Sequence, residues 1–201
     1  MIKINLVLKL SILLLILTFK VMAYEEAIYT TVYKNSIYEI RNYSNRLAIQ
    51  LTYTNDKKGF RKLFNYISGA NIDSKKINMT TPVTQSTKIS MTIPVTQSNE
   101  KANKVMQFFL PSNFTKKNAP EPTDDELSLK TIEQGYYAVM KYSGRITDKN
   151  FDKYKKILKD SLIKDNIKIL SSAIKATYNG PFTLPFLRRN EVMFLVIWKD
   201  Q

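Results

Sequence analysis

The residue types that most often perform catalysis or bind metals are scarce in this sequence. Its 201 residues include no histidine and no cysteine, which excludes a Ser-His-Asp triad, a cysteine nucleophile, a Cys/His zinc site and a disulfide framework. A lysine-assisted or carboxylate-based hydrolase remains an alternative. However, no stretch places a nucleophile beside a base in a recognisable turn, and the five glycines form no phosphate-binding loop. The sequence therefore predicts a binding protein rather than an enzyme, without catalytic or metal-ligating residues.

The N-terminal residues 1–23 have the pattern of a signal peptide. Lys3 lies near the start, an apolar run follows, and Ala23 supplies a small residue before the expected cleavage site. We therefore expect an exported protein, periplasmic or secreted, with residues 24–201 forming one domain. The alternative is an uncleaved N-terminal membrane anchor, although Lys20 ends the run short of the roughly 20 residues that span a bilayer.

The chain is strongly basic, with a formal net charge of +14. Removal of the first 23 residues takes away three lysines and no acid, which leaves +11. Such a balance is found in proteins that bind nucleic acid or anionic lipid. Here the lysines are scattered, with much of the excess between Lys149 and Lys175. We expect a solvated lysine face on a helix and no nucleic-acid partner, with peripheral membrane contact as the alternative.

The first half of the expected domain reads as two strands followed by a helix. Residues 38–43 and 46–54 are rich in β-branched and aromatic residues, which favours strands. Apolar residues then recur at helical spacing over 60–67, with Thr54 or Asn55 as the N-cap and Gly69 as the stop. The apolar face of this helix is expected to cover a sheet.

An internal repeat follows the helix. Residues 76–86 recur as 88–98, with nine of eleven positions identical at a spacing of 12. Only Thr87 lies between the copies, which predicts two adjacent antiparallel strands, each with an edge or bulge at its proline because proline donates no ladder hydrogen bond. Because side chains alternate between the two faces of a strand, every second residue of the first copy, from Ile77 to Val83, would lie on one face. The corresponding residues of the second copy, from Ile89 to Val95, would lie on the matching face. The two methionines, Met79 and Met91, are expected to be flexible core fillers.

The second half repeats the order of the first. After a strand at 104–111 and an acidic turn-rich connection, we expect further strands, a helix capped by Thr147 or Asp148, and a last strand buried on both faces. The remaining expected strands cover 127–132, 136–142, 173–178 and 192–198, and the helix stripe is Phe151, Tyr154, Leu158 and Leu162. Two successive sets of strands and a helix predict an α+β fold: a pseudo-twofold repeat of βαββ-type halves, with two helices on a curved antiparallel sheet or distorted barrel. An apolar cleft under a helix is the expected ligand site.

Several sequence blocks resemble the SOUL haem-binding protein family. The resemblance covers nearly all of residues 24–201 and is most specific in the doubled Lys-Ile-x-Met-Thr-x-Pro-Val and in the Arg-Arg-Asn-Glu-Val of residues 188–192. Further matching blocks are Tyr38–Tyr43, Phe60–Asn71, Phe108–Pro111, Tyr142–Gly144 and Tyr178–Asn179 with Pro185–Val192. The resemblance implies two βαββ-type halves related by a pseudo-twofold, similar to GyrI-like effector-binding domains.

The resemblance implies a binding site for haem or another tetrapyrrole. The helix positions that match the family's apolar patch are Phe60, Leu63, Phe64 and Ile67. Arg188 and Arg189 are then candidates to pair with the propionates through their fork-shaped donors. A strand-end arginine paired with Glu191 is the structural alternative for these two residues.

This chain departs from the family at the iron. It has no histidine, so an axial ligand would have to come from Met79, Met91, a tyrosine such as Tyr66 or Tyr178, or no protein residue. Asn65 also stands where a haem-binding relative carries a basic residue. Haem would therefore be held by apolar contacts, without strong coordination.

A second hypothesis keeps the cleft but changes the ligand. The similarity to GyrI-like effector domains suggests another apolar or amphipathic small molecule. Glu191 or Glu133 is then a candidate to meet a cationic group, although each is expected to be a surface carboxylate. The sequence does not indicate the oligomeric state.

Overall fold

The computed structural model describes residues 25–87 and 104–199. The predicted signal segment and the second copy of the repeat lie outside these residues. The elements, in chain order, are β1 Glu25–Glu26, β2 Tyr29–Lys34, β3 Glu39–Tyr43, β4 Arg46–Tyr53, α2 Asp56–Ile67, β5 Thr80–Thr81, β6 Val83–Thr87, β7 Lys104–Phe109, β8 Ser128–Ile132, β9 Gly135–Tyr142, α3 Asp148–Lys164, β10 Ile174–Thr177, the 3-10 turn η1 Pro185–Leu187 and β11 Asn190–Val196.

Nine strands form one antiparallel sheet in the order β2-β3-β9-β11-β10-β6-β7-β4-β8. If β2 is set aside, the order is symmetric about its centre, because the two halves of the chain contain the same succession of elements. The first half is β3, β4, α2, β6 and β7, and the corresponding elements of the second half are β8, β9, α3, β10 and β11. The first strand of each half pairs with a strand of the other half: β3 pairs with β9, and β8 pairs with β4. The central pair is β10 with β6. The predicted α+β fold with a pseudo-twofold is thus confirmed.

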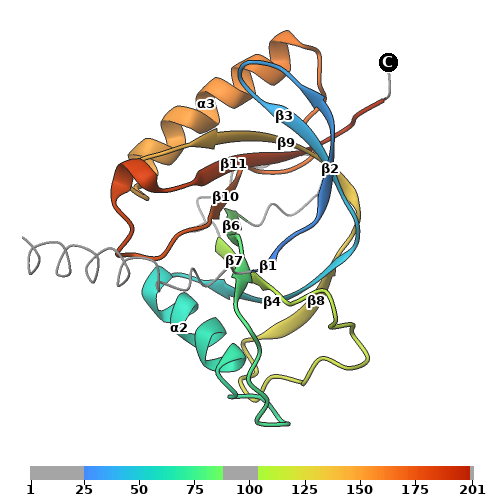
Figure 1. The fold of residues 1–201 in the computed structure, drawn as a ribbon, viewed down its shortest axis with the longest axis vertical. Helices are drawn as coiled ribbons and strands as arrows, with labels where there is room; N and C mark the ends of the chain where they lie inside the picture. The colour runs from blue at the N-terminus through green and yellow to red at the C-terminus, as the bar shows by residue number, and fades with distance from the viewer. Residues whose placement is uncertain (1–24, 88–103, 200–201) are drawn as a thin grey trace, which may run out of the picture.

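Both helices lie on one face of this sheet, which we call the outer face (Figure 1). Helix α2 covers β4 and β7, and α3 covers β9 and β11. The sheet curls toward the opposite, inner face. There the guanidinium carbon of Arg46 in β4 comes within 5.9 Å of the ring centre of Tyr137 in β9, although four strands separate β4 from β9 in the sheet. The result is a half-barrel with side chains of both halves meeting inside.

Helix α2 begins and ends at the predicted residues. The Asn55 side chain accepts a hydrogen bond from Lys58 N at 3.1 Å, as an N-cap does. Gly69 follows the helix with a φ of +113°, a conformation that glycine adopts without steric cost. The apolar face of the helix is fully buried at Leu63 and Tyr66.

Helix α3 begins at Asp148, with Thr147 as its N-cap. Leu158 and Leu162 are fully buried against the sheet, and Tyr154 stacks on Tyr142 with 4.4 Å between ring centres. Lysines cover the far side of the helix and are exposed, among them Lys153, Lys156 and Lys159. This part of the basic excess therefore faces water.

One strand prediction was wrong, and one strand was not predicted. The first repeat copy is not one strand: residues 76–79 carry no strand, and Pro82 separates β5 from β6. Proline cannot donate to a ladder, so the break falls at that residue. The N-terminal strand β2 was not predicted. It is a sheet edge with mostly exposed side chains, so it lacks the alternation that marks a half-buried strand.

Candidate functional site

The inner face carries a buried network of charged side chains at one end. Arg41 donates to both carboxylate oxygens of Glu191, at 2.9 and 3.0 Å, and also to Glu39. Arg189 donates to Glu191 through Nε at 3.0 Å, and the Tyr178 hydroxyl donates to it at 2.6 Å. Glu39, Arg41 and Glu191 share the inner face because they alternate with outer-face residues along β3 and β11, and Tyr178 and Arg189 flank the ends of β10 and β11.

Burial and hydrogen bonding shift the pKa values of the groups in this network. Burial lowers the pKa of Arg41, but hydrogen bonds and charge attraction from Glu191 outweigh it and raise the pKa above its usual value. Burial, together with the nearby Glu191 charge, raises the pKa of the Tyr178 hydroxyl far above 10.0. Tyr178 therefore remains a protonated donor at neutral pH.

Glu191 differs from its predicted position. It was expected to be a surface carboxylate, but it is fully buried. Its charge is met by Arg41 and Arg189, so it is not free to meet a cationic ligand. Glu133 is exposed, as expected.

A partly open cavity, which we call the inner cavity, lies beyond this network on the inner face. It has a volume of about 170 Å³ and receives side chains from both halves of the fold. The lining is mainly apolar and aromatic, with a few hydroxyl and amide groups and one charged residue: Tyr43, Arg46, Pro82, Thr84, Ser86, Gln107, Phe109, Ile132, Tyr137, Ile174 and Met193. No carboxylate is among them.

Arg46 is the charged residue of this inner cavity. Its guanidinium carbon lies 4.2 Å from the ring centre of Tyr43 and 4.3 Å from that of Phe109. Its buried Nε has no hydrogen-bond partner in the described part of the chain. Burial lowers the pKa of Arg46, opposed only in part by the hydroxyls of Tyr137 and Tyr43. Arg46 thus combines a positive charge with an environment that hydrates it poorly.

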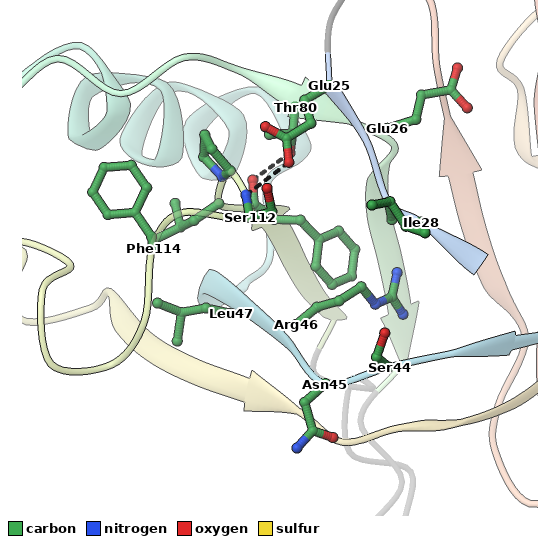
Figure 2. Close-up of a pocket in the computed structure, with 14 residues that line it drawn as sticks. Glu25, Glu26, Ile28, Ser44, Asn45, Arg46, Leu47, Thr80, Ser112 and Phe114 are labelled. Carbon is green, nitrogen blue, oxygen red and sulfur yellow. Dashed lines mark hydrogen bonds between the residues drawn. The ribbon is translucent and has the colours of Figure 1, made fainter.

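A second pocket, of about 160 Å³, adjoins the inner cavity and shares Arg46 and Phe109 with it. Figure 2 shows the Arg46 side chain extending toward Ile28, while the Glu25 carboxylate lies at Ser112. Glu25 accepts a hydrogen bond from Ser112 N at 2.8 Å. Arg46 therefore lines two adjoining spaces.

The four predicted α2 residues divide into two pairs. Leu63 and Ile67 belong to the core between the helix and the sheet, together with Tyr66. Phe60 and Phe64 are 40% and 46% exposed, and their rings stack with 6.2 Å between centres and 12° between planes. Only Phe60 and Phe64 present a surface on which a ligand can lie.

The candidate axial ligands are poorly placed for iron. Met79 packs against the α2 core, and Met91 lies outside the described residues. The Tyr66 hydroxyl donates to the Pro120 carbonyl at 2.8 Å, and burial raises its pKa to about 12. Tyr178 is hydrogen-bonded to Glu191. Neither phenol is disposed to become a phenolate ligand.

The two predicted arginines have different surroundings in the loop between β10 and β11. Arg188 donates to the carbonyls of Thr183 and Pro181, at 2.7 and 2.6 Å, which fixes the direction of its fork. Arg189 pairs with Glu26 and Glu191, so the structural alternative holds for Arg189. The same loop exposes four large apolar side chains: Phe182, Leu184, Phe186 and Leu187.

A separate groove lies between the two helices. It is a polar space of about 240 Å³, with Asp56, Lys104, Asp148 and Lys175 among its lining residues. Lys175 and Asp148 form an ion pair there at 2.6 Å. Within residues 25–87 and 104–199 we find no cluster of three metal-ligating side chains, and no helix in that range could span a bilayer.

Sequence reasoning missed Arg46 as a site residue. The signal was present in the alternation along residues 46–53, which puts Leu47, Ile49 and Leu51 on one face and Arg46 on the other. What the pattern could not show is that the inner face curls toward itself, which places the arginine side chain between aromatic rings.

The chain folds as an α+β half-barrel with a cavity on its inner face. The chain belongs to the family described as SOUL heme-binding protein, whose model matches residues 24–195. A comparison with curated protein sequences gives no match.

Solved structures share this fold at low sequence identity. The C-terminal domain of EcmrR is similar with a TM-score of 0.57 and 11% identity, covering 85% of this chain and 98% of that domain. A hydrolase encoded by lin2189 from Listeria innocua has a TM-score of 0.58 and 8% identity, covering 83% and 94%. Another hydrolase from Listeria innocua has a TM-score of 0.54 and 9% identity, covering 89% and 95%. These similarities establish the fold alone.

Proposed function

We propose that this protein binds a flat apolar ligand that carries carboxylates, namely haem or another tetrapyrrole, without a histidine ligand. The observation that carries the proposal is the stacked pair Phe60 and Phe64 on the exposed side of α2. Two nearly parallel rings form a flat apolar surface, and exposed apolar surface of this kind marks binding sites. The family to which the chain belongs supports the choice of ligand class.

The β10–β11 loop supplies the second part of the proposed site. Phe182 is 98% exposed, which leaves a full aromatic side chain in water. Arg188 is held by backbone carbonyls of this loop, and an arginine fork suits a propionate. Arg189 is engaged with Glu26 and Glu191, so we assign the propionate contact to Arg188 alone.

The proposed binding mode depends on apolar contact rather than on coordination. Tyr66 and Tyr178 use their hydroxyls in hydrogen bonds within the protein. The inner cavity, at about 170 Å³, is below the roughly 300–1,000 Å³ of pockets for drug-sized ligands. A tetrapyrrole would therefore lie on the surface of α2, with modest affinity.

Haemin titration tests this proposal. We expect a saturable Soret shift at one haemin per chain, weakened about tenfold or more in the double variant Phe60→Ala/Phe64→Ala, since two large apolar contacts are lost. Ile163→Ala on α3 is the matched control, because Ile163 is also an exposed apolar residue on a helix. Absence of a saturable shift in the unaltered protein, or equal binding by the double variant, would refute the proposal.

The runner-up ligand is a different apolar or amphipathic small molecule on the same surface. Native mass spectrometry of protein isolated from its source separates the two, since a tetrapyrrole mass or another mass travels with the chain. A hydrolase is the least supported reading, because the lining of the inner cavity offers Thr84 and Ser86 hydroxyls but no carboxylate or histidine as base.

We also propose that residues 1–23 direct export, to the periplasm or the medium. N-terminal sequencing of the exported protein tests this, with Tyr24 as the expected first residue. Recovery of the intact N-terminus in a membrane fraction would support the anchored alternative instead. Flotation with anionic vesicles tests separately for peripheral contact through the lysines of α3.

A further inference from the structure

Arg46 is a half-buried cation that forms no ion pair with a carboxylate of the described residues. Within residues 25–87 and 104–199, the ion pairs include Arg41, Arg189 and several lysines but not Arg46. Two acids line the adjoining pocket, and both have other partners: Glu25 accepts from Ser112 N, and Glu26 pairs with Arg189. Polar groups removed from water are normally paired, so the buried Nε of Arg46, which has no acceptor among the described residues, requires an explanation.

Aromatic contacts account for only part of the stabilisation of this cation. The guanidinium carbon lies within 4.3 Å of the ring centres of both Tyr43 and Phe109, which gives favourable cation–π contact. The buried Nε still has no acceptor in the described structure. This N–H donor is therefore available to an acceptor that enters the cavity.

The charge balance of the inner face favours an anionic ligand over a cationic one. The two acids buried at this end of the described sheet are already paired: Glu191 with Arg41 and Arg189, and Glu39 with Arg41 and Lys141. None of the eleven residues that line the inner cavity is acidic, and Arg46 is basic. A carboxylate fits this arrangement, because two parallel N–H groups of arginine match its two oxygens.

We propose that the inner cavity binds a small carboxylate with an apolar body, whose two oxygens accept from Arg46. Met193, Ile174 and Ile132 provide apolar contacts for the body, and the Thr84 hydroxyl and Gln107 amide lie in the same lining. The volume of about 170 Å³ limits the ligand to a compact acid, such as an aromatic or short branched monocarboxylate. This site is distinct from the proposed tetrapyrrole surface on α2.

Three probes of one shape test the proposal on the unaltered full chain. Benzoate, benzamide and benzylammonium are compared by isothermal titration at pH 7 and 150 mM salt. We expect saturable benzoate binding at one per chain, about tenfold or more tighter than benzamide, because hydrogen bonds to a charged group are stronger than neutral ones. Equal binding of benzoate and benzamide, or preference for benzylammonium, would overturn it.

Variants then locate the site. Arg46→Met should abolish the preference for benzoate over benzamide, and Arg46→Lys should reduce it, because lysine keeps the charge but loses the fork. Arg145→Met is the matched control, since Arg145 is an exposed arginine outside both cavities. An unchanged benzoate affinity in folded Arg46→Met would refute the assignment.

The two proposals fail separately. Phe60→Ala/Phe64→Ala should lower haemin binding and leave benzoate binding intact, whereas Arg46→Met should do the reverse. Loss of both activities in Arg46→Met with an unchanged melting temperature would mean that the sites are not distinct, and would contradict the proposal as stated. If neither Arg46 variant folds, the benzoate–benzamide comparison on the unaltered chain still decides it.

Discussion

Arg41 in β3 and Glu191 in β11 form a fully buried, two-pronged ion pair between residues 150 positions apart. Nη1 lies 2.9 Å from Oε2 and Nη2 lies 3.0 Å from Oε1. Since β9 separates the two strands in the sheet, the pair joins elements that share no backbone hydrogen bonds. Glu39 and Arg189 extend it to the ends of the same strands.

Neutralising Glu191 should destabilise the fold strongly. Glu191→Gln leaves Arg41 and Arg189 without their shared counter-charge in a buried site, and breaking such a pair costs about 3–5 kcal/mol. Urea unfolding followed by circular dichroism measures the loss. The matched control is Glu26→Gln, which removes an exposed partner of Arg189 and should cost about 1 kcal/mol or less. Equal effects of the two substitutions would contradict the assignment.

Alkaline pH should destabilise the protein through buried tyrosines. Burial raises the pKa of Tyr53, Tyr66 and Tyr142 from 10.0 to about 12. Between these values the native state keeps protons that the unfolded chain releases, so the stabilisation is complete below pH 10 and is lost as pH rises toward 12. Urea midpoints at pH 8, 10 and 11 should fall in that order.

Tyr66→Phe provides the check on this pH dependence. The variant loses the hydrogen bond to the Pro120 carbonyl at every pH. The quantity to compare between the variant and the unaltered protein is therefore the slope of stability against pH, not the stability at one pH. The decline above pH 10 should be shallower than in the unaltered protein, since one raised pKa corresponds to about 1.4 kcal/mol per unit. An identical slope would show that Tyr66 does not contribute.

Truncation of two neighbouring residues of α2 should have different effects on stability and on haemin binding. Leu63→Ala removes a fully buried side chain and should lower the free energy of unfolding by about 2–5 kcal/mol. Phe64→Ala truncates a half-exposed ring and should cost far less, while weakening haemin binding. Denaturation and haemin titration of both variants give four values. A large stability loss in Phe64→Ala would show that Phe64 serves the core rather than a ligand.

The cap of α2 should contribute to the stability of the helix that carries Phe60 and Phe64. Asn55→Ala removes the side-chain oxygen that accepts from Lys58 N, and loss of such a cap costs about 1 kcal/mol. Asn55→Asp keeps an acceptor and should preserve stability. Hydrogen exchange of the first-turn amides should accelerate in the alanine variant only. Unchanged exchange would argue that tertiary packing alone fixes this end.

The sequence predicted most of the framework because local signals agreed with the tertiary structure. The helical spacing after Phe60, the asparagine before it and Gly69 behind it delimit α2 to within a few residues. The uniformly apolar stretch from Val192 matches β11, a nearly completely buried strand at the middle of one half. The edge strand β2 was missed because its side chains face solvent.

The site was less predictable, because it depends on contacts between strands distant in sequence. Helical periodicity placed Leu63 and Phe64 in one stripe, although the sheet covers only Leu63. Glu191 looks like any strand-end acid until the curl of the sheet brings Arg41 to it. Arg46 gained its surroundings in the same way, from Phe109 and Tyr137 on other strands.

The exchange of first strands between the halves makes them inseparable. A chain cut in the connection between β7 and β8 would yield two fragments, each lacking the strand that completes it. The inner cavity lies across this seam and takes residues from both sides. A molecule bound there would contact both halves at once. Its binding free energy would therefore add to the free energy of unfolding of the whole domain, rather than to the free energy of opening one half.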